Sequence, residues 1–179
     1  MDARRRSGDL PSSHAVTIHE TVERAFVDAR DDVYRYLLTL GLDPEEAQDA
    51  AQEVFLRYYR ALKKGETIEN QRAWIFRVAH NHGLNLRARM KRTIPLDDIL
   101  ETRIAAEATA DRQLAETERA RALQDAVKLL SPQERRCLHL RISGLRYREI
   151  AGLMGVRIST AGKFLERAVK KLRQVADAY

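Results

Sequence analysis

The fold of this chain is decided by the stretch Gly144-Leu145-Arg146-Tyr147-Arg148-Glu149-Ile150-Ala151-Gly152-Leu153-Met154-Gly155-Val156, which continues into residues 157–173. In its first part, apolar residues recur at steps of three and four, and this period predicts a short helix. These residues are Tyr147, Ile150, Ala151 and Met154. Gly155 then supplies the backbone freedom that a tight turn requires before the chain redirects. The stretch therefore predicts a helix-turn-helix.

The second helix of this motif has one apolar and one basic face. Its apolar residues form a single stripe, which predicts a buried side: Ala161, Leu165, Ala168 and Leu172. The opposite face carries hydroxyl groups at its leading end and basic groups after them: Ser159, Thr160, Lys163, Arg167 and Lys170. Such a helix is typical of those that contact bases in the major groove of DNA. The alternative is a basic face that contacts only solvent.

The charge of the chain favours a polyanionic partner, because the net charge is +6 and the pI is near 9.7. Residues 131–179 hold eleven Lys/Arg and four Asp/Glu, net +7, whereas residues 93–118 hold two Arg and seven acids, net −5. The single cysteine, Cys137, excludes an intramolecular disulfide and fits a reducing compartment. No apolar run is long enough to cross a bilayer, so we expect a cytoplasmic protein without membrane insertion.

Two helices are predicted early in the chain. The first runs from about residue 22 and is ended by Gly41, in the position expected just past a helix. The second should begin at Asp43, whose carboxylate can cap the free backbone N–H groups. Pro44 fits the first helical position, and Glu46 can complete a capping box.

The second helix has a polar face that mixes both signs of charge. Its apolar side is predicted to be buried: Ala47, Ala51, Val54, Phe55, Tyr58 and Leu62. The opposite side holds Asp49, Gln52, Glu53, Arg57 and Arg60. This cluster suits a basic partner helix, and the alternative is a solvated face.

A third helix, after a loop that ends near Asn70, carries a polar stripe. Its predicted inward residues are Trp74, Ile75, Val78, Ala79 and His82. Its other face places amide and basic side chains at four-residue steps: Arg77, Asn81, Asn85 and Arg89. Further bases follow at Arg87, Lys91 and Arg92. Clustered bases suit a phosphate backbone and amides can contact base edges, although such a helix can also be plain surface.

The remaining segments divide the chain into domains. Residues 1–20 lack a sustained period and are expected to form a disordered tail, and residues 21–92 form the first domain. Residues 93–118 are acidic with little apolar patterning, which predicts a flexible linker. In the second domain, residues 119–179, a helix should start at Ser131-Pro132-Gln133-Glu134, with Cys137, Leu138 and Ile142 in its core. We therefore predict an all-α chain of two small helical domains, each with its own small core.

Three motifs resemble the extracytoplasmic-function (ECF) sigma factors of bacteria, which direct RNA polymerase to promoters. The segment from Asp49 to Leu56 is similar to the family's core-binding helix, and the segment from Ala73 to Asn81 to its melting segment. The third motif resembles the family's region 4: Leu130-Ser131-Pro132-Gln133-Glu134-Arg135 with Gly144-Leu145, Tyr147 and Glu149-Ile150-Ala151. The resemblance spans about residues 21–173.

The resemblance implies partners and residue roles. The expected contacts with the β′ clamp coiled coil of core RNA polymerase are Asp49, Gln52, Glu53 and Arg57. The expected −10 melting and recognition residues are Trp74, Arg77, Asn81, Asn85, Arg87, Arg89, Lys91 and Arg92. The expected −35 recognition residues are Arg157, Ser159, Thr160, Lys163, Arg167 and Lys170. Contact with the polymerase β flap and control by an anti-sigma factor are also implied. The resemblance implies no cofactor and no metal.

Four positions depart from the family pattern. The usual Ser or Thr caps of the helix-turn-helix are Arg146 and Arg157 here, and each change could cost about 1 kcal/mol. Gly162 and Phe164 stand where relatives often carry Lys and Arg. The −35 contact set should therefore be smaller or different.

Other functions fit the sequence less well. A two-domain helix-turn-helix regulator acting without polymerase would not need the Asp49 to Leu56 face or the paired asparagines. A helical decoy that mimics a sigma factor would not need the basic surfaces. An enzyme is disfavoured, because His80 and His82 point to different helix faces and Cys137 is expected in the core.

Overall fold

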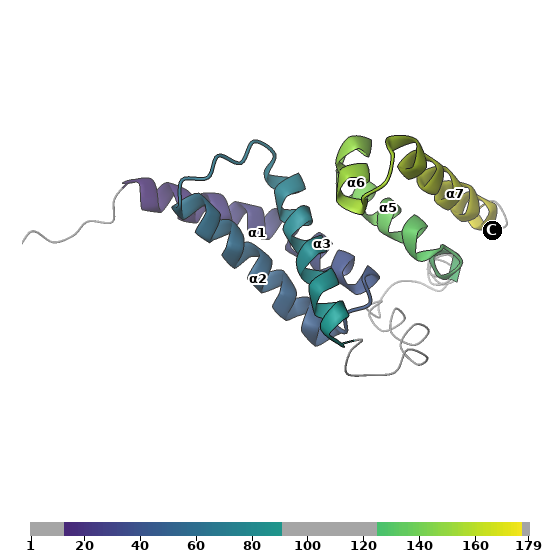
Figure 1. Cartoon of the computed structure of the whole chain (residues 1–179), viewed down its shortest axis with the longest axis horizontal. Helices are drawn as coiled ribbons and strands as arrows, with labels where there is room; N and C mark the ends of the chain where they lie inside the picture. Colours follow the sequence, from purple (N-terminus) through teal and green to yellow (C-terminus); the bar gives the residue numbers. More distant parts are fainter. Residues whose placement is uncertain (1–12, 91–124, 177–179) are drawn as a thin grey trace, which may run out of the picture.

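The computed structural model describes residues 13–90 and 125–176, which fold into two lobes of α-helices without a strand in these ranges (Figure 1). The N-terminal lobe consists of α1 (Ser13–Thr39), α2 (Pro44–Lys63) and α3 (Gln71–Met90). The C-terminal lobe consists of a helical turn at 125–128, α5 (Pro132–Ile142), α6 (Tyr147–Met154) and α7 (Ile158–Ala176). The predicted all-α fold with two helical lobes is confirmed. The predicted linker, residues 93–118, lies outside the described residues.

Helix α1 starts earlier than predicted. It begins at Ser13, so the tail predicted for residues 1–20 is wrong for residues 13–20, while residues 1–12 lie outside the described range. No glycine or proline occurs between Pro11 and Gly41, so nothing in this segment stops the helix from extending toward the N-terminus.

The predicted start of α2 is confirmed by its cap geometry. The Asp43 carboxylate accepts a hydrogen bond from the Glu46 N–H at 2.9 Å, and the Asp43 N–H donates to the Glu46 carboxylate at 3.0 Å. Pro44 is the first helical residue. Both orphan N–H groups are satisfied within the helix's own first turn, so this boundary depends on local sequence alone.

The core of the N-terminal lobe corrects the inward face predicted for α3. Phe76 and His80 are buried there, whereas His82, predicted to point inward, is only half-buried. Trp74 and Val78 are half-buried as well. Apolar residues occur on several sides of α3 because it packs against both α1 and α2, and periodicity alone therefore could not select the innermost face.

The C-terminal lobe is stabilised by a buried acid. Glu134 closes the predicted capping box with Ser131, and its carboxylate also lies 2.7 Å from Lys171 Nζ of α7. Burial opposes the charged form, but these hydrogen bonds and the lysine charge outweigh it and lower the pKa of Glu134. Ile142, predicted to be core, is 75% exposed, because α5 ends there and the chain turns away.

The helix-turn-helix forms as predicted. Gly155 follows α6 with a φ of 66°, a left-handed conformation that L side chains rarely adopt. The predicted apolar stripe of α7 is buried at Ala161, Leu165 and Ala168. At the start of α6, Arg146 offers no side-chain cap, but Glu149 accepts a hydrogen bond from its N–H at 2.7 Å. One half of the capping box thus remains.

The two lobes pack against each other, which corrects the prediction of two separate cores. Helix α5 contacts α1, and α6 contacts α3. The buried residues form one continuous cluster that includes Tyr36 and Phe76 of the N-terminal lobe and Leu140 and Ile150 of the C-terminal lobe. The sequence could not predict this contact, because each lobe's helical period shows only that an apolar face is covered.

Candidate functional site

The outer face of α2 presents the predicted acidic and polar cluster to solvent. Asp49, Gln52 and Arg57 are exposed, and Glu53 is partly covered. Arg57 Nε donates to Glu53 Oε1 at 2.8 Å, and Arg60 Nη1 lies 3.5 Å from the same oxygen. The hydrogen bond from Arg57 is the main reason that the pKa of Glu53 is lowered. The face therefore carries an internally paired acid beside the exposed Asp49.

Leu56 is a surface residue that the sequence reasoning did not single out for this face. Its side chain is 44% exposed although it is a large apolar residue, and one turn separates it from Gln52 and Glu53. A leucine exposed to this extent among polar groups can supply apolar contact area to a partner protein. The sequence signal that could have identified Leu56 was its position in the helical period of α2, outside the stripe of buried apolar residues.

The four-residue stripe predicted on α3 exists as one exposed surface. Arg77, Asn81, Asn85 and Arg89 are all exposed and follow one another along the helix. The surface offers amide donors and acceptors flanked by two guanidinium groups. Such a set can bind base edges and phosphates together.

Of the three other predicted bases, the structure describes only Arg87, which does not join this stripe. Arg87 lies on a different face of α3, where its Nη1 donates to the Leu40 carbonyl at 2.8 Å and its guanidinium packs beside Gly41. It ties the end of α1 to α3, so its position fits a structural role better than a DNA contact. Lys91 and Arg92 lie outside the described residues.

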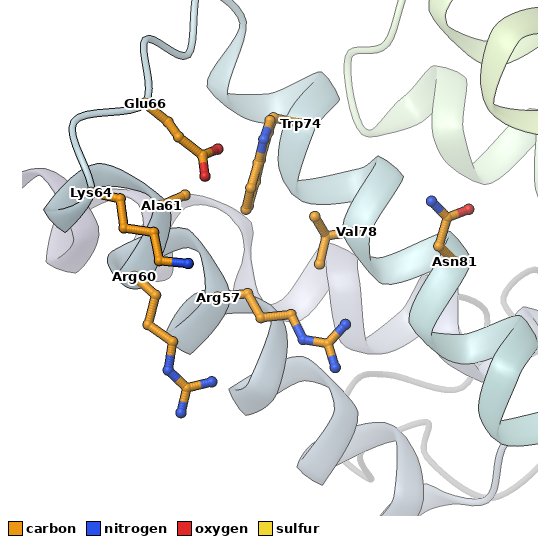
Figure 2. Close-up of a pocket in the computed structure, with 8 residues that line it drawn as sticks. All are labelled: Arg57, Arg60, Ala61, Lys64, Glu66, Trp74, Val78 and Asn81. Atoms are coloured by element: carbon orange, nitrogen blue, oxygen red, sulfur yellow. The ribbon is translucent and has the colours of Figure 1, made fainter.

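A pocket of about 310 Å³ lies between α2, α3 and the loop that joins them (Figure 2). Trp74, Val78 and Asn81 line it from α3. The opposite wall consists of Arg57, Arg60, Ala61, Lys64 and Glu66. Its size is at the lower end of the range for small-ligand pockets, and its walls combine an aromatic ring, an amide and three cations. The pocket brings Arg57 of the α2 face together with Asn81 of the α3 stripe.

Trp74 is positioned by the core beneath it. Its ring centroid lies 5.5 Å from that of Tyr58, and the side chain is only half-buried. Lys64 and Glu66, which the sequence analysis did not single out, complete the rim. The spacing of Trp74 and Asn81, seven residues apart on one side of α3, was the signal that could have predicted this pocket.

The second basic surface is on α7. Arg157, Ser159, Lys163, Arg167 and Lys170 are exposed, and Thr160 is partly covered. Ala161 and Leu165 face the other way into the core, so the basic face can approach a groove without disturbing the packing. A Cβ at the position of Gly162 would lie 4.0 Å from the Tyr147 ring, and Phe164 is half-buried against the core.

Titratable groups elsewhere do not assemble into a metal site in the described part of the chain. Within residues 13–90 and 125–176, no three His, Cys, Asp or Glu side chains are placed to hold a metal ion. His80 is buried against Tyr36, and burial lowers its pKa. The thiol of Cys137 is buried 3.1 Å from the Met154 sulfur, and burial raises its pKa to about 11. In the same ranges, no helix is both long and apolar enough to span a membrane.

Comparison with known proteins matches each lobe to a protein-family model. The family model "Sigma-70 region 2" matches residues 26–93, and "Sigma-70, region 4" matches residues 120–172. The chain is 30% identical over 166 residues to the ECF RNA polymerase sigma factor SigL of Mycobacterium tuberculosis, covering 90% of this chain and 92% of SigL. It is 32% identical over 149 residues to SigE of Mycolicibacterium smegmatis, covering 80% of this chain but only 56% of SigE.

Solved structures share the fold. The sigma factor RpoE of Bartonella quintana, solved with the anti-sigma factor NepR, superposes with a TM-score of 0.67 at 18% identity, covering 88% of this chain and 98% of that one. CnrH, solved with the cytosolic domain of CnrY, gives 0.55 at 19% identity, covering 92% and 96%. With both family models matched and SigL covered almost completely, this chain belongs to the ECF family of RNA polymerase sigma factors.

Proposed function

We propose that this chain binds core RNA polymerase, directs it to promoters with specific −10 and −35 elements, and helps to open the DNA. The observation that carries the proposal is the pairing of two surfaces on α3: the exposed Asn81 and Asn85 stripe, and the pocket that Asn81 shares with Trp74. Opening the DNA in this way requires no catalysed reaction, because binding energy alone can hold an opened strand.

The pocket and stripe suit a single strand taken out of the duplex. A base leaving the stack needs donors and acceptors for its edge and a ring or apolar wall for its face, which Asn81, Trp74 and Val78 offer. Arg77 and Arg89 flank the stripe and suit the phosphates on either side. In this proposal −10 recognition and strand opening are one binding event.

The outer face of α2 is the proposed contact with the β′ clamp coiled coil. Asp49 and Gln52 offer exposed polar groups, and Leu56 adds an apolar centre between them and Arg57. Glu53 holds Arg57 by a 2.8 Å hydrogen bond, so its contribution includes positioning that guanidinium. Positively and negatively charged residues around a leucine favour a partner helix that also carries charges of both signs.

The C-terminal lobe is the proposed −35 module. Its proposed DNA contacts are Arg157, just before α7, and Ser159, Thr160, Lys163, Arg167 and Lys170 of α7. We further propose that this lobe contacts the polymerase β flap. The related fold of RpoE, solved with the anti-sigma factor NepR, supports the expectation of an anti-sigma factor for this chain as well. A protein with these partners works in the cytoplasm.

Run-off transcription with purified core polymerase tests the proposal. The full chain is added to core enzyme on a pool of genomic promoter fragments, and transcripts that start at defined positions are expected only when both proteins are present. A transcription regulator acting without polymerase would instead protect specific DNA by itself and leave core enzyme silent. That second result would refute the sigma-factor assignment of function.

A further inference from the structure

We propose that Glu166 of α7 recognises a cytosine in the −35 element, by accepting a hydrogen bond from the N4 amino group of that base in the major groove. This assignment rests on the proposed function and adds to it a residue that determines sequence preference. Its starting point is a single acid on a surface that otherwise consists of basic and hydroxyl groups.

Glu166 lies within the basic face of α7. At about 100° per residue, it projects about 60° from Lys163 and about 40° from Lys170 around the helix axis. The three buried residues of the apolar stripe all lie about 100° or more away from it: Ala161, Leu165 and Ala168. The side chains of Glu166, Lys163 and Lys170 are exposed. A helix that presents these lysines to DNA therefore presents this carboxylate to DNA as well.

The surroundings of Glu166 are strongly basic. It is the only acid among the 19 residues of α7, which include five bases: Lys163, Arg167, Lys170, Lys171 and Arg173. Lys163 lies three residues before Glu166 and Lys170 four residues after it, spacings at which helix side chains are neighbours. Even so, the Glu166 side chain forms no ion pair or hydrogen bond with another residue of the described ranges, 13–90 and 125–176. Its carboxylate oxygens are therefore available to a partner.

Glu166 differs in this respect from the other acids of the C-terminal lobe. Among residues 125–176, Asp125 pairs with Lys128, Glu134 pairs with Lys171, and Glu149 accepts a hydrogen bond from the Arg146 N–H. Each of these three acids stabilises the lobe through a contact of its own. The contacts within the described lobe assign no such structural role to Glu166, so a role on DNA is the one that its position supports.

A carboxylate in the major groove has few favourable partners. Phosphates repel it, and so do the N7 and O6 acceptors of guanine. The donors in this groove are the amino groups of cytosine and adenine, N4 and N6. Adenine N6 adjoins the N7 acceptor, which repels the carboxylate, whereas cytosine N4 adjoins only the C5 hydrogen. Cytosine is therefore the base that Glu166 favours.

The flanking lysines permit the acid to enter the groove. The ammonium groups of Lys163 and Lys170 offset the repulsion between the carboxylate and the DNA phosphates. At a position without cytosine, the carboxylate would lose its hydration and gain no donor, which is costly for a charged group. Glu166 thus acts chiefly by weakening binding to sequences with the wrong base.

Two substitutions test the assignment in holoenzyme binding to a −35 library. The library varies the −35 element of a promoter that gives a run-off product and keeps its −10 element constant. Glu166→Ala should reduce the discrimination in favour of cytosine at one position about tenfold, mainly by strengthening binding to the other bases. Glu166→Gln should change the preferred base at that position from cytosine to adenine, because a glutamine amide pairs with N6 and N7 of adenine.

Asp125→Asn is the matched control. It removes one negative charge from an exposed position of the same lobe, outside α7, and should leave the base preference unchanged throughout the library. Alanine and glutamine are both good helix formers and Glu166 is exposed, so its two variants should keep the helical circular dichroism signal.

The outcomes separate this assignment from the proposed function. If wild-type holoenzyme shows no preference for cytosine in the −35 element, or if both Glu166 variants retain the wild-type preference at every position, the assignment is wrong even when transcription is normal. A uniform change in binding across the library would also overturn it, because the carboxylate would then act only through its charge. If wild-type protein gives no run-off product from any promoter, the proposed function fails, and the role of Glu166 fails with it.

Discussion

The hydroxyl of Tyr36 lies 2.7 Å from Nδ1 of His80, joining α1 to α3 inside the core of the N-terminal lobe. Tyr36 is fully buried and His80 nearly so. Burial raises the pKa of Tyr36 and lowers that of His80, so both groups are neutral at physiological pH. The pair satisfies two polar groups that would otherwise be costly to bury.

Replacing Tyr36 with Phe should therefore destabilise the lobe. The ring contacts remain, but His80 Nδ1 loses its partner, and an unsatisfied buried group costs about 1–3 kcal/mol. Urea unfolding of the full chain measures the change in the free energy of unfolding. Tyr59→Phe, at a partly exposed position of α2, is the control and should change it by less than about 0.5 kcal/mol. Equal effects would show that the hydrogen bond contributes nothing.

The α2 face should be required for binding core polymerase. Replacing Asp49, Gln52 and Glu53 together with Ala removes the exposed polar groups and releases Arg57, while alanine preserves the helix. Pull-down by core enzyme should be abolished, and the circular dichroism signal should be kept. The double change Glu20→Ala and Glu23→Ala, on the exposed side of α1, should leave pull-down intact. Unaltered binding of the triple variant would place the polymerase contact elsewhere.

Asn81 and Asn85 should act on DNA and not in folding, because both are exposed. Replacing both with Ala should lower transcription from a duplex promoter roughly tenfold, equivalent to about 1.4 kcal/mol. The loss should be smaller on a template melted in advance if opening is their main role. Leu84→Ala, also exposed on α3, serves as the control. If the double variant transcribes both templates at the wild-type level, the two asparagines are ordinary surface residues without a role in promoter binding.

Arg167 and Lys170 should differ in what they contact. Arg167→Ala should cost about 1–3 kcal/mol on the preferred −35 sequence and relax the preference there, as expected for a lost base contact. Lys170→Ala should weaken binding to all −35 sequences about equally. It should also reduce the slope of log binding constant against log salt concentration by about 1, as expected for the loss of one phosphate contact. Holoenzyme binding to a −35 library at several salt concentrations separates the two. If Arg167→Ala weakens binding equally for every sequence in the library, Arg167 contacts only the DNA backbone.

Local chemistry was sufficient to predict much of this protein from sequence. The starts of α2 and α5 follow from capping boxes at Asp43 and Ser131, whose hydrogen bonds span only three residues. The exposed stripe of α3 and the buried stripe of α7 follow from the helical period. In each case the deciding interactions lie within one or two turns of the chain.

Tertiary structure decided what depends on distant segments. It selected His80 and not His82 for the core, because α1 packs on that side of α3, and it engaged Arg87 with the Leu40 carbonyl 47 residues away. It also made the Trp74 pocket and the hydrogen bond between Asn70 and Glu149, which are 79 residues apart in the sequence. A helical period shows that a face is covered but not by which partner, since the covering helix is fixed only when distant apolar surfaces pack together.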